Sequence, residues 1–207
     1  AGGMDMPTPR KGDLIQVETD SDVLAFEFNA DGSLLAGSTM DTAIRLWDGR
    51  TGKPLAVEHG HRDLVRAITF SPDQRLLASY GTDRTVRLWS AETLTLVQVY
   101  HGHVAPSFSH SQESLAFLSD GSRLVTSDTF ESIRVWDATI RGDPYTLSGH
   151  SSYVYPVVVS PDGTLIASGG WDNIVCLWDA TDGTEVARLL GHEHFILSLA
   201  FSSDGNR

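Results

Sequence analysis

Two sets of residues in this sequence carry the side chains that a serine hydrolase uses. They are His61, Ser79 and Asp83 in the first set, and His150, Ser168 and Asp172, with the same offsets, in the second. In a hydrolase, such residues make a nucleophile, a general base and a group that orients the base. One active site needs one triad, however, and neither serine lies in a nucleophile-elbow sequence. The repetition favours a structural role, so we expect no enzymatic activity.

Other candidate chemistry is sparse. Three pairs of histidines could be interpreted as metal ligands: His59 and His61, His101 and His103, and His192 and His194. One member of each pair belongs to a recurring Gly-His dipeptide, which indicates a structural role, so we expect no metal site. Cys176 is expected to be a small buried residue rather than a reactive thiol. The sequence has no phosphate-binding loop or dinucleotide fingerprint, and we therefore expect no cofactor and no small-molecule substrate.

The composition indicates a soluble, acidic globular chain. Its 207 residues are 41% hydrophobic, and its formal net charge of −12 disfavours nucleic acid and anionic membranes as partners. No apolar run reaches the roughly 18 residues of a membrane span, and the first residues lack the apolar stretch of a signal peptide. A single cysteine excludes an internal disulfide and fits the cytoplasm. The chain starts with alanine and stops directly after a turn signal, so we expect a fragment or a processed product.

The sequence repeats itself with a period of about 42 residues, which is typical of repeat architectures. Four tryptophans are separated by 42, 47 and 42 residues, and four Gly-His dipeptides keep the same spacing. The extra five residues of the third unit lie between His103 and Trp136. The markers are Trp47, Trp89, Trp136 and Trp178, and His61, His103, His150 and His192.

Each unit has the local pattern of four short antiparallel strands. In the second unit LVRAITF, RLLASY, TVRLWS and TLVQVY are rich in β-branched and apolar residues and are bounded by turn formers. Asp-Gly dipeptides separate the first two strands in most units, and no segment has a helical period. A unit of this size cannot bury both apolar faces alone. We therefore expect an all-β fold in which the sheets stack like blades around an axis.

These residues resemble the WD-repeat β-propeller family. The resemblance runs through GHRDLVRAITFSPDQRLLASYGTDRTVRLW and GHSSYVYPVVVSPDGTLIASGGWDNIVCLW, and covers nearly the whole chain after Leu14. Trp47, Trp136 and Trp178 are each followed by aspartate, whereas Trp89 is followed by Ser90. The four-fold recurrence makes the resemblance specific.

The phase of the repeats predicts a single partial propeller over 1–207, with four full blades and two partial ones. Propellers of this family most often have seven blades, so we expect two or more to be absent. The expected parts are 1–18, a tail and the outer strand of a preceding blade; blades at 19–60, 61–102, 103–149 (with an inserted loop) and 150–191; and 192–207, carrying the inner strand of a truncated blade.

The resemblance implies that the apparent triads are structural hydrogen-bonded chains. Tryptophan donates to the hydroxyl, the hydroxyl to histidine and histidine to aspartate, so that every buried polar group has a partner. The first unit has Thr19 and Gly37 at the histidine and serine positions, and the third has Phe130 at the aspartate position. The third blade should therefore be the least regular. The network residues are His61, Ser79, Asp83 and Trp89; His150, Ser168, Asp172 and Trp178; His103, Thr126 and Trp136; and Asp41 and Trp47.

The resemblance also implies a binding face. Three positions per blade point to it: three and five residues after the histidine, and one before the turn aspartate. These positions are Asp22, Leu24 and Met40; Leu64, Arg66 and Thr82; Tyr153, Tyr155 and Trp171; and Phe195 and Leu197, with Phe108 as a further candidate. From them we select Tyr153, Tyr155, Trp171, Phe195, Arg66, Leu64 and Met40 as protein-binding, because aromatic residues and arginine dominate binding hot spots.

The expected function is a non-catalytic scaffold that binds a protein or peptide on this face. Fold-level analogy carries part of this expectation. Two alternatives stay open: a regulatory or sensor propeller attached to a catalytic domain outside this stretch, and an enzyme with a site in the axial channel. For the aromatic residues, the alternative is that Tyr153, Tyr155 and Phe195 pack between blades.

Overall fold

The computed structural model describes residues 16–102, 114–127, 131–139, 144–205 and 207, and these contain strands and turns but no helix. Sixteen strands form four sheets, each with four antiparallel strands paired in chain order. The all-β fold of four-stranded blades expected from the repeats is confirmed. The strands are β1 (Val23–Phe28), β2 (Leu34–Thr39), β3 (Ile44–Asp48) and β4 (Pro54–Glu58); β5 (Val65–Phe70), β6 (Leu76–Gly81), β7 (Thr85–Ser90) and β8 (Leu96–His101); β9 (Leu115–Phe117), β10 (Arg123–Ser127), β11 (Ser132–Asp137) and β12 (Tyr145–Ser148); and β13 (Val154–Val159), β14 (Leu165–Gly170), β15 (Val175–Asp179) and β16 (Glu185–Leu189).

Tight turns join the first two strands of each blade. Gly32, Gly121 and Gly163 have φ of +69°, +71° and +73°, a region that glycine occupies without steric cost. Gln74 takes the same conformation at φ +64° in the second blade, where the sequence has no glycine. A serine hydroxyl before the turn also binds the turn aspartate, with Ser160 Oγ donating to Asp162 Oδ1 at 2.6 Å. These turns fix the register of each hairpin.

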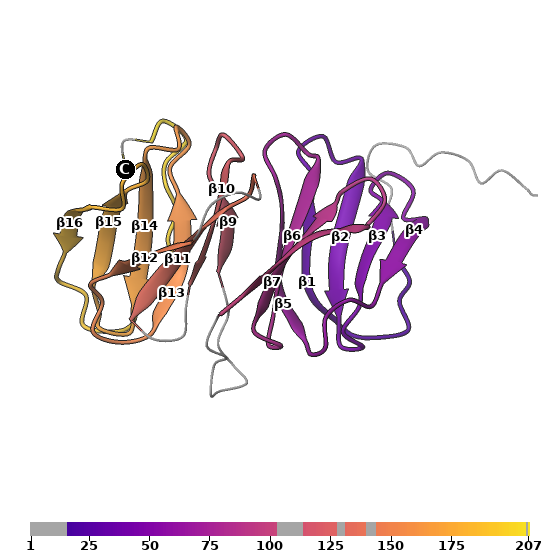
Figure 1. The fold of residues 1–207 in the computed structure, drawn as a ribbon, viewed down its shortest axis with the longest axis horizontal. Helices are drawn as coiled ribbons and strands as arrows, with labels where there is room; N and C mark the ends of the chain where they lie inside the picture. The colour runs from indigo at the N-terminus through magenta and orange to yellow at the C-terminus, as the bar shows by residue number, and fades with distance from the viewer. Residues whose placement is uncertain (1–15, 103–113, 128–130, 140–143, 206) are drawn as a thin grey trace, which may run out of the picture.

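The core consists of three layers between neighbouring blades. Figure 1 shows the sheets following one another from the violet β1–β4 blade on the right to the yellow-orange β13–β16 blade on the left. One buried cluster joins the first and second blades, another the second and third, and a third cluster the third and fourth. The second and third blades therefore each bury two faces against different neighbours, as a radial stack requires.

The first blade has one open face. The side chains of Phe26 and Phe28 on β1 are 71% and 50% exposed, whereas Ile68 and Phe70, at the same positions 42 residues later, are 7% and 6% exposed. The difference arises because the first blade covers Ile68 and Phe70, and no sheet in the described part of the chain covers β1 in the same way. This face is the apolar end of the stack of four described blades.

The inner strand expected at Phe195–Phe201 is not formed, because residues 195–201 have no strand assignment. Of the outer strand expected within 1–18, the structure describes only residues 16–18, and these have no strand assignment either. A strand needs the ladder hydrogen bonds of a neighbour, and no strand in the described part of the chain pairs with either segment. In the third blade, β9 is only three residues long and follows 103–113, so the inserted loop itself lies outside the described residues.

Candidate functional site

A chain of hydrogen bonds crosses the second blade from Trp89 to Asp83. Trp89 Nε1 donates to Ser79 Oγ at 2.8 Å, and Ser79 Oγ lies 2.7 Å from His61 Nε2. His61 Nδ1 lies 3.0 Å from Asp83 Oδ1. Because the carboxylate can only accept, Nδ1 carries the proton and Nε2 accepts from the serine hydroxyl. The histidine is therefore the neutral Nδ1–H tautomer.

The fold holds this histidine in place through backbone groups and a glycine. Asp83 also accepts from the backbone N–H of Arg62 at 2.9 Å and from the hydroxyl of Thr85 at 2.7 Å. A Cβ on Gly81, the last residue of β6, would lie 2.5 Å from His61 Nδ1. The imidazole therefore packs directly on the strand, and only glycine leaves room for it there.

Burial and hydrogen bonding set the protonation states of this pair. Burial lowers the pKa of His61 from its ordinary value of 6.5, because the charged form loses its hydration, and the hydrogen bond to Asp83 opposes this only in part. Burial raises the pKa of Asp83, but hydrogen bonds from His61, Arg62 and Thr85 outweigh that effect and hold it well below 3.8. The pair is a neutral imidazole beside a carboxylate.

The fourth blade repeats the arrangement. Trp178 Nε1 donates to Ser168 Oγ at 2.8 Å, Ser168 Oγ lies 2.9 Å from His150 Nε2, and His150 Nδ1 lies 2.9 Å from Asp172 Oδ2. A Cβ on Gly170 would lie 2.6 Å from His150 Nδ1, as at the equivalent glycine of the second blade. Two blades thus share one internal architecture.

The first blade departs from this arrangement, and the described residues of the third blade show one of its bonds. In the third, Trp136 Nε1 donates to Thr126 Oγ1 at 2.8 Å, while His103 and Phe130 lie outside the described residues. In the first, Gly37 replaces the serine, and a Cβ there would lie 2.8 Å from the Trp47 ring. The indole of Trp47 therefore packs where the hydroxyl lies in the other blades.

In the first blade Asp41 is bound by Arg45, a partner that the sequence analysis missed. Its guanidinium binds Asp41 through two bonds of 2.9 and 2.6 Å and also contacts Thr39. These hydrogen bonds hold the pKa of Asp41 well below 3.8. An arginine four residues after the turn aspartate also occurs at Arg87, so this spacing was the available signal.

The buried serines are poorly suited to nucleophilic catalysis. Ser79 and Ser168 are fully buried, and each hydroxyl is bonded to both an indole and an imidazole. A nucleophile must instead reach substrate with a free lone pair. The geometry supports a role in holding the blade together.

The cysteine thiol and the possible metal-ligating side chains also show no reactive site. Cys176 is buried on β15, and burial raises the pKa of its thiol to about 11, so the reactive thiolate is scarce at neutral pH. Within the described ranges, no three His, Cys, Asp or Glu side chains are grouped so that they could hold a metal ion. Among the described residues there is also no helix of the length and hydrophobicity needed to cross a membrane.

Three aromatic rings form a cluster at the surface of the fourth blade. The ring of Trp171 is stacked on that of Phe195, with centroids 4.8 Å apart and planes at 13°. Tyr153 meets Trp171 edge to face at 5.3 Å and 64°. Trp171 and Phe195 remain 42% and 52% exposed. We call Tyr153, Trp171 and Phe195 the aromatic cluster.

Backbone hydrogen bonds position this cluster. The backbone N–H of Trp171 donates to the carbonyl of Tyr153 at 2.8 Å, and that of Ile196 donates to Gly170 at 3.2 Å. Similar bonds of 2.9 Å from Met40 to Asp22, and of 2.8 Å from Thr82 to Leu64, join the equivalent positions of the first two blades. The structure therefore brings together the residue three after the histidine and the residue before the turn aspartate in three blades.

The other expected binding residues differ in exposure. Met40 is exposed, whereas Leu64, Arg66 and Tyr155 are half-buried. Burial raises the pKa of the Tyr155 phenol. Phe108 lies outside the described residues. Of the selected set, Trp171, Phe195 and Met40 present the largest exposed fractions of an apolar side chain.

Comparison with known sequences identifies the family. Residues 12–48, 52–90 and 143–179, which make up more than half of the chain, match the family described as WD domain, G-beta repeat. The chain belongs to the WD-repeat family. The matches leave out 91–142, which includes most of the third unit with its inserted loop. The WD-repeat resemblance expected from the sequence is confirmed.

Several WD-repeat relatives are similar over parts of the chain. Nuclear distribution protein PAC1 of Coccidioides posadasii is 30% identical over 150 residues, which cover 69% of this chain and 31% of that protein. Small ribosomal subunit protein RACK1 of Medicago sativa is 63% identical over 30 residues, covering 14% of this chain and 9% of the relative. A probable serine/threonine-protein kinase, PkwA of Thermomonospora curvata, is 45% identical over 49 residues, covering 24% and 7%. The matching parts of the chain thus span about a third or less of the length of these relatives.

Proposed function

We propose that this WD-repeat chain is a non-catalytic interaction scaffold that binds a protein or peptide at the aromatic cluster. The observation that carries the proposal is the exposed stack of Trp171 on Phe195, with Tyr153 at its edge. Tryptophan and tyrosine are enriched among binding hot spots because they bury a large area with few rotatable bonds. A pre-stacked cluster also loses little conformational entropy when a partner covers it.

The rest of the molecule supports the same class of partner. The buried hydroxyls of Ser79 and Ser168 are already bonded, which argues against catalysis at these serines. The net charge of −12 disfavours nucleic acid and anionic membranes. A relative named as a small ribosomal subunit protein is by that name part of a larger assembly. A protein or peptide partner is consistent with all three.

Peptides selected from a random displayed library against the wild-type chain would test the proposal. Trp171→Ala and Phe195→Ala should each weaken the binding of these peptides by about 2 kcal/mol or more. Leu96→Ala is the matched control, because Leu96 is 49% exposed on the outer strand β8, and it should leave binding unchanged. Selected peptides whose affinity is insensitive to Trp171→Ala would contradict the proposed site.

A second candidate function is regulation of an attached catalytic domain. It is favoured by the match to the probable serine/threonine-protein kinase PkwA. The matching stretch covers only 7% of the length of that protein. In that case the aromatic cluster would bind a segment of the same polypeptide. Determining the complete reading frame that contains these residues decides between the two: a kinase sequence in it would support this candidate, and a frame of WD repeats alone would exclude it.

A further inference from the structure

Two neighbouring segments of the second blade reverse the charge of this acidic chain. Residues 61–67 lead into β5, and residues 81–87 contain the hairpin loop between β6 and β7. Together they hold four arginines and two aspartates, a net charge of +2, whereas the whole chain carries −12. We call Arg62, Arg66 and Arg84 the arginine patch.

Hydrogen bonds hold the two segments against each other. The backbone N–H of Arg62 donates to Asp83 Oδ2 at 2.9 Å, and Arg84 follows Asp83 directly in the sequence. The backbone N–H of Thr82 donates to the carbonyl of Leu64 at 2.8 Å. The positions of Arg62 and Arg84 are therefore set by the same network that fixes the blade.

The side chains of Arg62 and Arg84 are exposed and have no counter-ion within the chain. Neither guanidinium has a hydrogen bond or an ion pair with another residue in the part of the chain that the structure describes. The Asp83 side chain between them is only 4% exposed, and it already pairs with His61 and, at 3.5 Å, with Arg87. It therefore does not neutralise the two exposed cations.

Arg66 and Asp63 add one charge of each sign beside this pair. Arg66 is half-buried at a bulge, where β5 shifts its register against β6, and a bulge changes the direction of a side chain. Asp63 is exposed, and its carboxylate accepts from the backbone N–H of Leu64 at 2.8 Å. The patch thus keeps an excess of positive charge.

The fold itself does not require arginine at these positions. The equivalent residues of the fourth blade, 89 positions later, are Ser151, Tyr155 and Asn173. Arg84 and Asn173 both have φ of +66°, a conformation in which asparagine is enriched among non-glycine residues and arginine is not. The two blades share a backbone there but present different chemistry.

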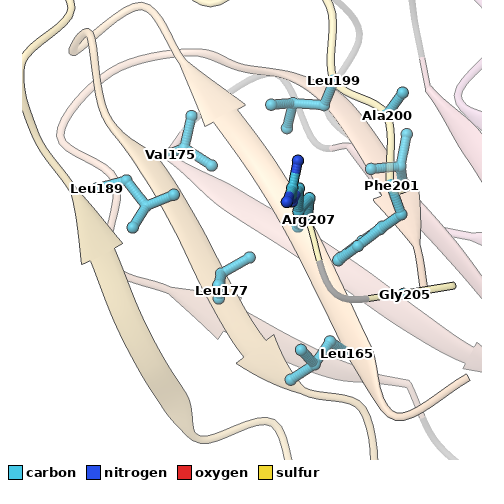
Figure 2. A pocket seen from close by; sticks show the side chains of 11 residues that line it. Leu165, Val175, Leu177, Leu189, Leu199, Ala200, Phe201, Gly205 and Arg207 are labelled. Atoms are coloured by element: carbon cyan, nitrogen blue, oxygen red, sulfur yellow. The ribbon is translucent and has the colours of Figure 1, made fainter.

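A hollow of the fourth blade offers no comparable group of cations. Figure 2 shows Leu165, Leu177 and Leu189 around it, and Arg207 is the single charged residue of its lining. An anionic ligand therefore gains more from the second blade than from this hollow.

We propose that the arginine patch binds an acidic peptide segment of a partner protein. Aspartate or glutamate carboxylates of that segment pair with the guanidinium groups of Arg62 and Arg84, whose planar N–H donors match a carboxylate. Charge complementarity selects this occupant, because the patch is positive on a chain whose net charge repels anions. The inference goes beyond the proposed function, since it requires neither Trp171 nor Phe195.

Fluorescence anisotropy at low ionic strength tests the proposal with a labelled peptide of alternating glutamate and glycine. The same peptide with glutamine in place of glutamate should bind about ten-fold or more weakly. In the chain, Arg62→Ser with Arg84→Asn introduces the residues of the fourth blade, and should weaken binding of the glutamate peptide about ten-fold.

A matched control removes two positive charges from the other end of the blades. Arg50→Thr with Arg75→Thr changes the turns between β3 and β4 and between β5 and β6, again to the residues of the fourth blade. It should alter the affinity by less than about two-fold, because exposed charges far from the peptide are screened. Circular dichroism shows whether both double variants keep the β fold.

NMR separates this site from the aromatic cluster. The glutamate peptide should shift the backbone amide signals of Arg62 and Arg84 and leave the indole signal of Trp171 in place. Equal affinity for the glutamate and glutamine peptides, or equal losses in the two double variants, would overturn the proposal. A dimer that the peptide does not displace and that Arg62→Ser with Arg84→Asn disperses would show that a second copy occupies the patch instead.

Discussion

Trp171 is stacked on Phe195 although 23 residues of sequence, including the strands β15 and β16, separate them. The contact joins the hairpin loop between β14 and β15 to the segment that follows the fourth blade. Neither side chain belongs to the buried clusters between blades. The stack is therefore a feature of the surface and not of the core between blades.

Removing either ring of the stack should cost little stability. An aromatic pair contributes about 0.5–1.5 kcal/mol beyond the area that it buries, and about half of each side chain is already exposed, so Trp171→Ala and Phe195→Ala should each lower the free energy of unfolding by less than about 3 kcal/mol. The double variant should lose less than the sum, since both substitutions break the same contact. Urea unfolding measures this. A loss above about 3 kcal/mol for either one would show that these rings belong to the core.

Trp89→Ala should destabilise the chain strongly. The substitution removes a fully buried ring and the donor to Ser79, so we expect a loss of about 3–5 kcal/mol. Trp89→Phe keeps most of the ring but not the N–H, and should lose less. An unfolding midpoint like that of the wild type for Trp89→Ala would refute the structural role of the network.

Phe28 and Phe70 occupy the same position in two successive repeats and offer a matched pair of substitutions. Phe28→Ala should lower the free energy of unfolding by less than about 1.5 kcal/mol, because half of the Phe28 side chain is already exposed. Phe70→Ala, 42 residues later, should cost about 3–5 kcal/mol, because Phe70 is buried between blades. Equal losses in urea unfolding would mean that the face around Phe28 is covered in solution.

Acid should destabilise the fold below about pH 6.5. Burial lowers the pKa of His61 from 6.5, so the unfolded chain binds a proton that the folded chain resists, and stability falls as the pH drops toward the folded pKa. The stabilisation that depends on the lowered pKa of Asp83 persists until below about pH 4.

Urea midpoints between pH 7.5 and 5 measure this dependence. His61→Gln should be less stable at every pH but should show a shallower decline, since it lacks one of the titrating groups. A wild-type midpoint that rises as the pH falls through this range would contradict the neutral state of His61.

Much of the architecture could be predicted because the sequence of each blade contains local markers of its strands and turns. The tryptophan and Gly-His spacings located the repeats, and the Asp-Gly turns located the first hairpins. The residues at 195–201 resemble the inner strands of the other units in sequence but form no strand. The reason is that strand formation depends on a neighbouring strand, which a pattern within one segment does not report.

The site was less accessible to sequence reasoning. The positions of Tyr153 and Trp171 follow from the repeat, because one backbone hydrogen bond recurs between them. The stacking of Trp171 on Phe195 does not, since it depends on how a segment outside the blade packs back onto the loop. Arg45 was not predicted as the partner of Asp41, because the resemblance implies a histidine there, whereas the structure has an arginine on β3.

The most direct measurement of partner binding at the aromatic cluster uses the indole N–H signals in NMR spectra. The chain has five tryptophans, of which Trp47, Trp89, Trp136 and Trp178 are buried and Trp171 is exposed. Titration with a selected peptide should shift the Trp171 signal and leave the other four in place. Saturation by the peptide with an unchanged Trp171 signal would contradict the proposed site.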